Sequence, residues 1–128
     1  MNNPRYLLDT CTVIFLTAKG SRIPAGLEEE LDKSDLFISA VTEIELLSNK
    51  ALLPDDEKKL RVLISERLNV IDLSEAIKNE VIALRRCTEL TFPDSIIAAT
   101  AIVHNAVLLT SDTVLLRINR PGYKTRKL

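Results

Sequence analysis

The sequence is poor in the residues that mark several specialised classes of protein. Only 4% of its 128 residues are aromatic, and it has three Gly and five Pro. This scarcity argues against Gly- and Pro-rich linkers and low-complexity segments. The chain also lacks a large excess of charge of either sign, because its formal net charge is −1. The chain as a whole therefore has no strong attraction to nucleic acid or to anionic membranes, and any such contact needs a local basic cluster.

Cysteine, histidine and long apolar runs are scarce too. The two cysteines, Cys11 and Cys87, are too few for a disulfide framework, and with a single His they give little support to a zinc site. The longest apolar stretch, residues 95–103, is too short to cross a membrane. No basic-then-apolar leader opens the chain. We therefore expect a protein of the reducing cytoplasm, without a membrane segment.

The composition that remains is that of a globular protein rich in aliphatic residues. Hydrophobic residues make up 46% of the chain and charged residues 27%. A chain of this length typically forms one domain and buries a core without disulfides or metals to staple it. We predict a single domain over residues 1–128.

The hydrophobic pattern predicts strands that alternate with helices. Apolar segments typical of buried strands lie at residues 6–9, 36–39, 69–73 and 106–110, and residues 123–128 are expected to form a short final strand. Helical periodicity or helix-start signals appear at residues 12–17, 24–32, 40–47, 54–68, 74–87, 93–103 and 113–116. Continuously apolar strands separated by helices predict a three-layer α/β/α fold with a mainly parallel sheet. The strands that end near Leu8 and Leu109 are expected side by side at its centre.

Acidic residues follow several of these predicted strands. Asp9 ends the first strand, and Asp112 stands just past the fourth. Ligands of parallel sheets bind beyond the carboxyl ends of the strands, so both acids belong to one edge. Glu45 lies on the helix after the second strand and can lean back toward that edge. The helix of Asp94 precedes its strand, and the pattern assigns the start of this helix to the opposite edge.

Each acid also has a purely structural explanation. Asp9 and Asp112 each precede a helix that they could cap. Asp94 follows Pro93 in a first helical turn, where the helix dipole favours acids. Glu45 is more informative, because at about 100° per residue it shares the apolar face of its helix, where an unpaired carboxylate is costly. An Arg or Lys partner is the alternative for Glu45.

Several carboxylates gathered in one cleft indicate a particular chemistry. They repel one another, so either some are protonated or a cation holds them together. Magnesium and manganese favour oxygen ligands of this kind. A carboxylate-bound magnesium ion points to phosphate chemistry, because it activates water and neutralises charge that develops on phosphate.

With these residues in place, the chain resembles the PIN-domain family, and most closely the VapC-type toxins of bacterial toxin–antitoxin pairs. Four stretches carry the resemblance: Leu7-Leu8-Asp9-Thr10, residues 38–46 (ISAVTEIEL), residues 93–101 (PDSIIAATA) and residues 108–112 (LLTSD). They span almost the whole chain, in the order and spacing of the family.

The resemblance implies properties that spacing does not show. It implies a PIN-like fold in which four acids meet in one cleft as metal-binding and catalytic residues, namely Asp9, Glu45, Asp94 and Asp112. It further implies an endoribonuclease dependent on Mg²⁺ or Mn²⁺, an RNA substrate, a homodimer, and a small VapB-like antitoxin that holds the enzyme inactive. Glu43 matches no family acid.

Two positions depart from the family pattern. Cys11 stands where the family often has Asn, and Ser111 stands where Arg often precedes the last acid, which makes Asp112 the least secure of the four. The alternative function is a PIN-fold binding or regulatory module with weak or no activity. A phosphoaspartate switch is disfavoured, because neither the adjacent acids that it needs beside Asp9 nor its Lys after Thr110 are present.

Two basic clusters and one thiol remain. The C-terminal cluster could contact phosphate or form a solvated tail, and consists of Arg117, Arg120, Lys124, Arg126 and Lys127. Arg85 and Arg86 could contact RNA or pair with Glu89, and pairing is favoured. Cys11 is expected to be buried beside Asp9.

Overall fold

The computed structural model describes residues 3–128 and is built on a five-stranded sheet with the order β3-β2-β1-β4-β5. The strands are β1 (Arg5–Leu8), β2 (Asp35–Ser39), β3 (Asn69–Ile71), β4 (Val107–Thr110) and β5 (Lys124–Lys127). All four neighbouring pairs are parallel, and Leu8 is in register with Leu109 at the centre. The predicted parallel sheet and its central pair are confirmed.

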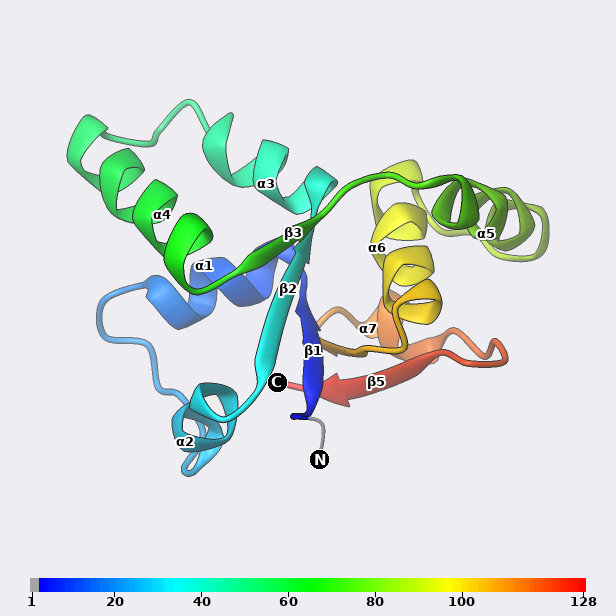
Figure 1. The fold of residues 1–128 in the computed structure, drawn as a ribbon, viewed down its shortest axis with the longest axis horizontal. Coiled ribbons are helices and arrows are strands. Elements are labelled where there is room, and N and C mark those ends of the chain that lie inside the picture. Colours follow the sequence, from blue (N-terminus) through cyan, green and yellow to red (C-terminus); the bar gives the residue numbers. More distant parts are fainter. Residues whose placement is uncertain (1–2) are drawn as a thin grey trace.

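Helices cover both faces of this sheet (Figure 1). They are α1 (Thr10–Thr17), α2 (Leu27–Asp32), α3 (Ala40–Leu47), α4 (Pro54–Glu66), α5 (Glu75–Cys87), α6 (Phe92–Val103) and α7 (Thr113–Arg117). The α1, α2 and α4 helices pack on one face, and α5, α6 and α7 pack on the other. Helix α3 joins the two sides, because Val41 packs with the α6 side and Leu46 with the α1 side. The predicted three-layer α/β/α fold is confirmed.

Neighbouring residues of the central strands point into different cores. Leu7 and Leu108 belong to the core beneath α5 and α6. Leu8 and Leu109 belong to the core beneath α1 and α4. A sheet covered on both faces needs apolar residues at every strand position, which explains the uninterrupted apolar runs in the sequence. Within residues 3–128, no helix combines the length and apolarity that crossing a membrane requires.

Two helices begin two or more residues away from the predicted positions, and in both cases the backbone explains why. Helix α1 starts at Thr10, earlier than expected, because Asp9 takes an extended conformation and caps it. Helix α2 starts at Leu27, later than the predicted Pro24, because Gly26 takes a left-handed conformation with φ of 81°. Only glycine adopts that conformation readily, so the helix cannot extend back through it.

The direction of α6 contradicts the sequence prediction. Residues 104–106 alone connect α6 to β4, so α6 ends where β4 begins, at the amino edge of the sheet. A helix that ends at the amino edge begins at the carboxyl edge. Asp94, in the first turn of α6, therefore lies at the same edge as the ends of β1 and β4. The prediction of the opposite edge was wrong because the end of a helix, and not its start, adjoins the strand that follows.

Candidate active site at the carboxyl edge of the sheet

Asp9 is a buried carboxylate at the junction of β1, β4 and α1. It is 5% exposed and immediately follows β1. Its Oδ1 accepts a hydrogen bond of 2.8 Å from the Thr12 backbone N–H, and its Oδ2 accepts one from the Thr110 hydroxyl. These two donors offset the cost of burying the charge and fix the orientation of the carboxylate. Asp9 does cap α1, yet each of its oxygens keeps a lone pair for a further partner.

Thr110, the last residue of β4, links Asp9 to Asp112. Its hydroxyl donates to Asp9 and accepts the backbone N–H of Asp112 at 3.0 Å. Asp112 in turn caps α7, because its Oδ1 accepts the Val114 N–H at 2.8 Å. One buried hydroxyl thus sets the relative positions of two candidate acids.

Glu45 reaches the same edge from α3, although not in the way its sequence predicts. The buried residues of α3 are Thr42 and Leu46, whereas Glu45 is exposed and its neighbour Ile44 is 63% exposed. The prediction that Glu45 shares a buried apolar face was wrong, because the fully buried residues of this short helix are Thr42 and Leu46 and the Glu45 side chain stays exposed. The Thr10 hydroxyl donates to Glu45 Oε1 at 2.6 Å and so holds the carboxylate near the end of β1.

Asp94 lies close enough to the other three acids to be affected by their charges. Its side chain is half-buried, and its backbone N–H donates to the Thr91 hydroxyl that caps α6. Burial raises the pKa of Asp94, and the negative charges of Asp112, Glu45 and Asp9 raise it further. The structure therefore brings all four predicted acids within electrostatic range of one another at the carboxyl edge.

Cys11 lies among the same charges. Its pKa is raised first by partial burial and then by the four carboxylates, in the order Asp9, Asp112, Glu45 and Asp94. The residue is exposed, so the prediction of a buried thiol was wrong. The inward positions of α1 are taken by Thr12 and Val13, which leaves the Cys11 side chain facing outward.

Tyr123 is a neighbour of the site that the sequence gave no reason to single out. Burial raises its pKa well above the ordinary tyrosine value, and the charges of Asp94, Asp112 and Asp9 contribute. Its hydroxyl donates to the Leu115 carbonyl oxygen at 2.7 Å. Nothing in a turn before an edge strand marks such a residue. The hydroxyls of Thr10 and Thr110, by contrast, stand beside the acids in the sequence and could have been proposed as their supports.

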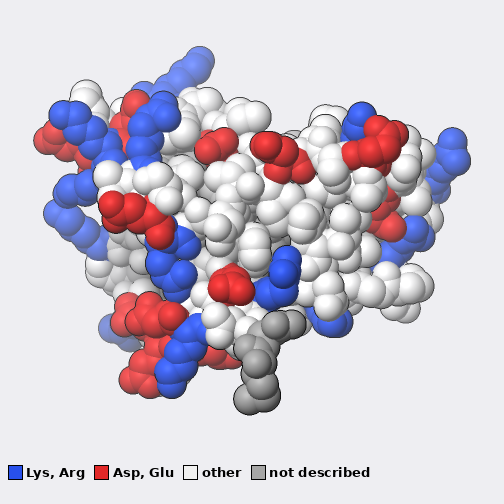
Figure 2. Space-filling view, viewed as in Figure 1, with Lys and Arg blue, Asp and Glu red and all other residues white. Residues whose placement is uncertain are grey.

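Basic residues do not neutralise the four acids. Within the described part of the chain the ion pairs are Arg61–Glu57, Lys78–Glu75, Arg120–Glu80 and Arg126–Glu30. Arg120 and Arg126 of the C-terminal cluster are therefore engaged with acids on α5 and α2. On the face shown in Figure 2, lysine and arginine side chains are interspersed with acids and form no single basic patch. The acidic edge keeps its negative charge.

The chemistry of these side chains fits a hard divalent cation. Carboxylate oxygens without basic partners are the ligands that magnesium and manganese prefer. The pKa of Asp94 is raised first by burial and then by repulsion from the other carboxylates, and a cation would relieve that repulsion. In residues 3–128, however, no three His, Cys, Asp or Glu side chains stand close enough together to form a complete metal-binding group. The edge thus supplies suitable ligand types, and their side chains would have to move closer together to share one ion.

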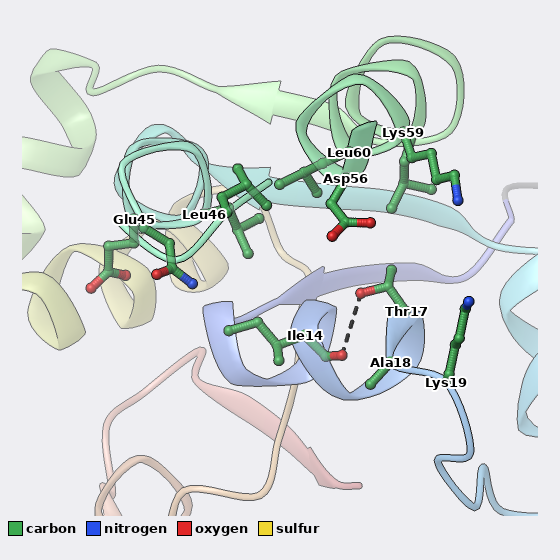
Figure 3. A pocket seen from close by; sticks show the side chains of 12 residues that line it. Ile14, Thr17, Ala18, Lys19, Glu45, Leu46, Asp56, Lys59 and Leu60 are labelled. Carbon is green, nitrogen blue, oxygen red and sulfur yellow. Dashed lines mark hydrogen bonds between the residues drawn. The ribbon is translucent and has the colours of Figure 1, made fainter. Parts of the chain in front are cut away.

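A groove of about 580 Å³ leads away from this edge between α1, α3 and α4. Its lining is largely apolar and includes Ile14, Leu46 and Leu60. Figure 3 shows Glu45 on one side of the groove and the two lysines, Lys19 and Lys59, on the other. The groove therefore runs from Glu45 at the acidic edge, past apolar side chains, to an end where Asp56 lies beside the two lysines.

Comparison with known proteins identifies relatives over nearly the full chain. A family model described as PIN domain matches residues 6–121. No curated protein sequence matches the chain.

Similar solved structures are complexes. A toxin–antitoxin complex from Klebsiella pneumoniae is 28% identical, with 93% of this chain and 98% of that chain covered and a TM-score of 0.72. A DNA-bound VapBC from Salmonella typhimurium is 26% identical, with coverages of 97% and 98% and a TM-score of 0.73. VapBC-1 from nontypeable Haemophilus influenzae is 25% identical, with coverages of 95% and 96% and a TM-score of 0.73.

Proposed function

Because the chain belongs to the PIN-domain family, whose members are nucleases, we propose that it is a divalent-metal-dependent endoribonuclease and the toxin of a toxin–antitoxin pair. The observation that carries the proposal is the convergence of four acids from separate elements on one sheet edge. Burial and the neighbouring negative charges raise the pKa of Asp94 at this edge. A bound cation would stabilise the charged carboxylates there. RNA, with its chain of phosphates, is the substrate, and the cytoplasm is the place of action.

In this proposal Asp9, Glu45, Asp94 and Asp112 are the ligands of Mg²⁺ or Mn²⁺. A bound ion would supply Lewis acidity, which lowers the pKa of a water molecule and offsets charge on the phosphate. Thr110 and Thr10 hold the carboxylates of Asp9 and Glu45 in place through their hydroxyls. One carboxylate accepts the proton of the attacking water as the phosphorus–oxygen bond to the leaving group breaks. Positioned charge, and not a covalent nucleophile, accounts for the catalysis.

The partner in this proposal is a small antitoxin, and the enzyme itself is a homodimer. The groove between α1, α3 and α4 has the apolar lining that binds an amphipathic segment. An acidic residue of such a segment would face Lys19 and Lys59, and a basic residue would reach Glu45. A segment bound in this way covers the acidic edge and blocks access of RNA. The similar structures are themselves complexes of toxin and antitoxin.

The test is cleavage of structured RNA with magnesium, with manganese and with a chelator. Asp9→Asn and Asp94→Asn keep the shape of each side chain and remove a ligand charge, so both variants should abolish cleavage. Glu43→Gln, on the same helix as Glu45 but outside the acidic edge, is the matched control and should cut like the parent. Cleavage that survives the chelator, or full activity of both Asn variants, would show that the site is assigned wrongly. A parent that binds RNA without cutting it would instead favour the binding module.

A further inference from the structure

An exposed aromatic residue begins α6 beside the acidic edge. Phe92 is 58% exposed, whereas the chain's other phenylalanines, Phe15 and Phe37, are partly buried. The guanidinium of Arg85 lies over the Phe92 ring, 5.4 Å from the ring centroid, and forms a cation–π contact between α5 and α6. The sequence alone favoured pairing of Arg85 with Glu89, but among residues 3–128 no ion pair joins Arg85 or Arg86 to that acid.

The position of Phe92 relative to the acids follows from helix geometry. Phe92 precedes Asp94 by two residues in the same first turn of α6. At about 100° per residue, the two side chains leave the helix on nearly opposite sides. Phe92 thus faces α5 and Asp94 faces the other acids, about one helix diameter apart, or roughly 10 Å. A base on Phe92 and a phosphate at the acids would belong to nearby nucleotides of one strand.

The charges around Phe92 suit a nucleic-acid strand. Arg85 and Arg86 occupy the last turn of α5, where the helix dipole favours positive charge, and both are exposed. The acidic edge itself repels phosphate, so affinity for RNA has to come from its surroundings. An arginine stacked on an aromatic ring offers a flat surface for a base together with donors for a phosphate.

We propose that Phe92 and Arg85 form a stacking platform that binds an unpaired base of the RNA, and that Arg86 contacts the adjoining phosphate. The platform positions the strand so that a neighbouring phosphate reaches the four acids. This inference rests on the proposed ribonuclease function. Stacking on an aromatic ring tolerates any base, so the platform contributes affinity and register more than sequence preference.

Binding measured without cleavage tests the platform. Fluorescence anisotropy of a labelled single-stranded RNA of about 16 nucleotides, near the upper end of single-domain footprints, is recorded in the cleavage-deficient Asp9→Asn background. Phe92→Ala and Phe92→Leu should bind about 5- to 150-fold more weakly, as expected for the loss of one stacked base. Phe92→Trp keeps an aromatic face and should bind like the parent. Arg85→Ala should weaken binding and reduce its dependence on salt.

Matched controls lie on the opposite face of the sheet. Val62→Ala removes an apolar side chain that is 52% exposed on α4, and Arg22→Ala removes an exposed arginine between α1 and α2. Both should leave RNA affinity unchanged. In the active enzyme, Phe92→Ala should raise KM much more than it lowers kcat, because the platform touches substrate away from the reacting phosphate.

Three outcomes would overturn the inference. The first is unchanged RNA affinity of Phe92→Ala and Arg85→Ala. The second is loss of binding in Phe92→Trp as severe as in Phe92→Ala. The third is a Phe92→Ala or Arg85→Ala variant that changes its oligomeric state, measured by light scattering, while its RNA affinity is unchanged. That result would make this surface a protein interface. If the parent neither binds nor cuts RNA, the proposed function itself is refuted. If Phe92→Ala cuts RNA as well as the parent does, only the platform is refuted.

Discussion

Thr110 is the side chain through which two of the four acids are held in place. It is fully buried, donates to Asp9 and accepts from the backbone of Asp112. Asp9 and Asp112 also cap α1 and α7. The structural explanation of these acids as helix caps is therefore confirmed, and it is compatible with the proposed metal site because a capping bond leaves lone pairs on the carboxylate.

Replacing Thr110 with Val removes this hydroxyl and keeps the shape of the side chain. The Asp112 N–H and one Asp9 oxygen lose their partners inside the protein, which should cost about 1–3 kcal/mol of stability. Cleavage should fall about 10- to 100-fold, the range seen when supports of metal ligands are lost. Urea unfolding and metal-dependent RNA cleavage measure the two effects. Thr110→Ser retains the hydroxyl and should stay near the parent; equal activity of Val and Ser variants would contradict a positioning role.

At the scale of elements, α1 and α3 serve both the site and the groove. Helix α1 carries Thr10, which holds Glu45, and Ile14, which lines the groove. Helix α3 contributes Glu45 and Leu46 to the groove wall. An antitoxin segment that binds between these helices would thus contact the elements that position a catalytic acid. Under the proposed function, inhibition and catalysis would share this part of the fold.

Ile14→Gln separates the two roles. Ile14 is 50% exposed and lines the groove, so its loss should weaken antitoxin capture by about 2 kcal/mol, or roughly 30-fold. RNA cleavage by the free enzyme should be unaffected. Co-expression with the product of the neighbouring gene, followed by size exclusion with light scattering, measures capture. Val62→Gln, equally exposed but outside this groove, is the control. Capture that is indifferent to Ile14→Gln would place the antitoxin elsewhere.

At the scale of the whole molecule, the burial of Asp94 and its repulsion by the other acids oppose folding. The folded-state pKa of Asp94 lies above its ordinary value of 3.8, chiefly through burial and then through the other three carboxylates. A raised carboxyl pKa means that the folded state binds more protons than the unfolded state between the two values. Stability contributed by this group is therefore present at low pH and lost as pH rises through the folded pKa. If the acidic edge is the active site that we propose, this is a cost in stability of the kind that active sites commonly carry.

The expected result is a metal-free protein that loses some stability as pH rises above 3.8 through the raised pKa of Asp94. Asp94→Asn should remove this component and be more stable than the parent at neutral pH in chelator, and added magnesium should narrow the difference. Thermal unfolding followed by calorimetry measures this, and we propose one cooperative transition for residues 1–128 as a single domain. Glu89→Gln, an exposed acid near α6, is the control. A less stable Asp94→Asn protein would contradict net repulsion at this position.

The sequence by itself determined the architecture and the identity of the acids. Uninterrupted apolar strands have only one stable arrangement, a sheet covered on both faces, and helices between the strands make that sheet parallel. Asp9 follows β1 directly and Asp112 lies two residues past β4, so the topology alone assigns both to one edge. The position of Glu45 after the second strand allowed it to lean toward that edge, whereas the pattern assigned Asp94 to the opposite edge and only the motif resemblance grouped Asp94 with the other acids.

Only the tertiary structure decided how these residues face one another. The edge reached by Asp94 depends on the direction of α6, which the short α6–β4 connection fixes. The exposure of Glu45 and of Cys11 depends on which side of α3 and α1 packs, and in helices this short the apolar pattern does not single out one side. Tyr123 lies near acids that are distant in the sequence, and Phe92 contacts Arg85 from a separate helix. Neither contact produces a periodic signal in the sequence. The local hydrophobic pattern predicts helices and strands because it follows which residues are buried. A site consists of contacts between elements, and only their packing in the folded protein establishes those contacts.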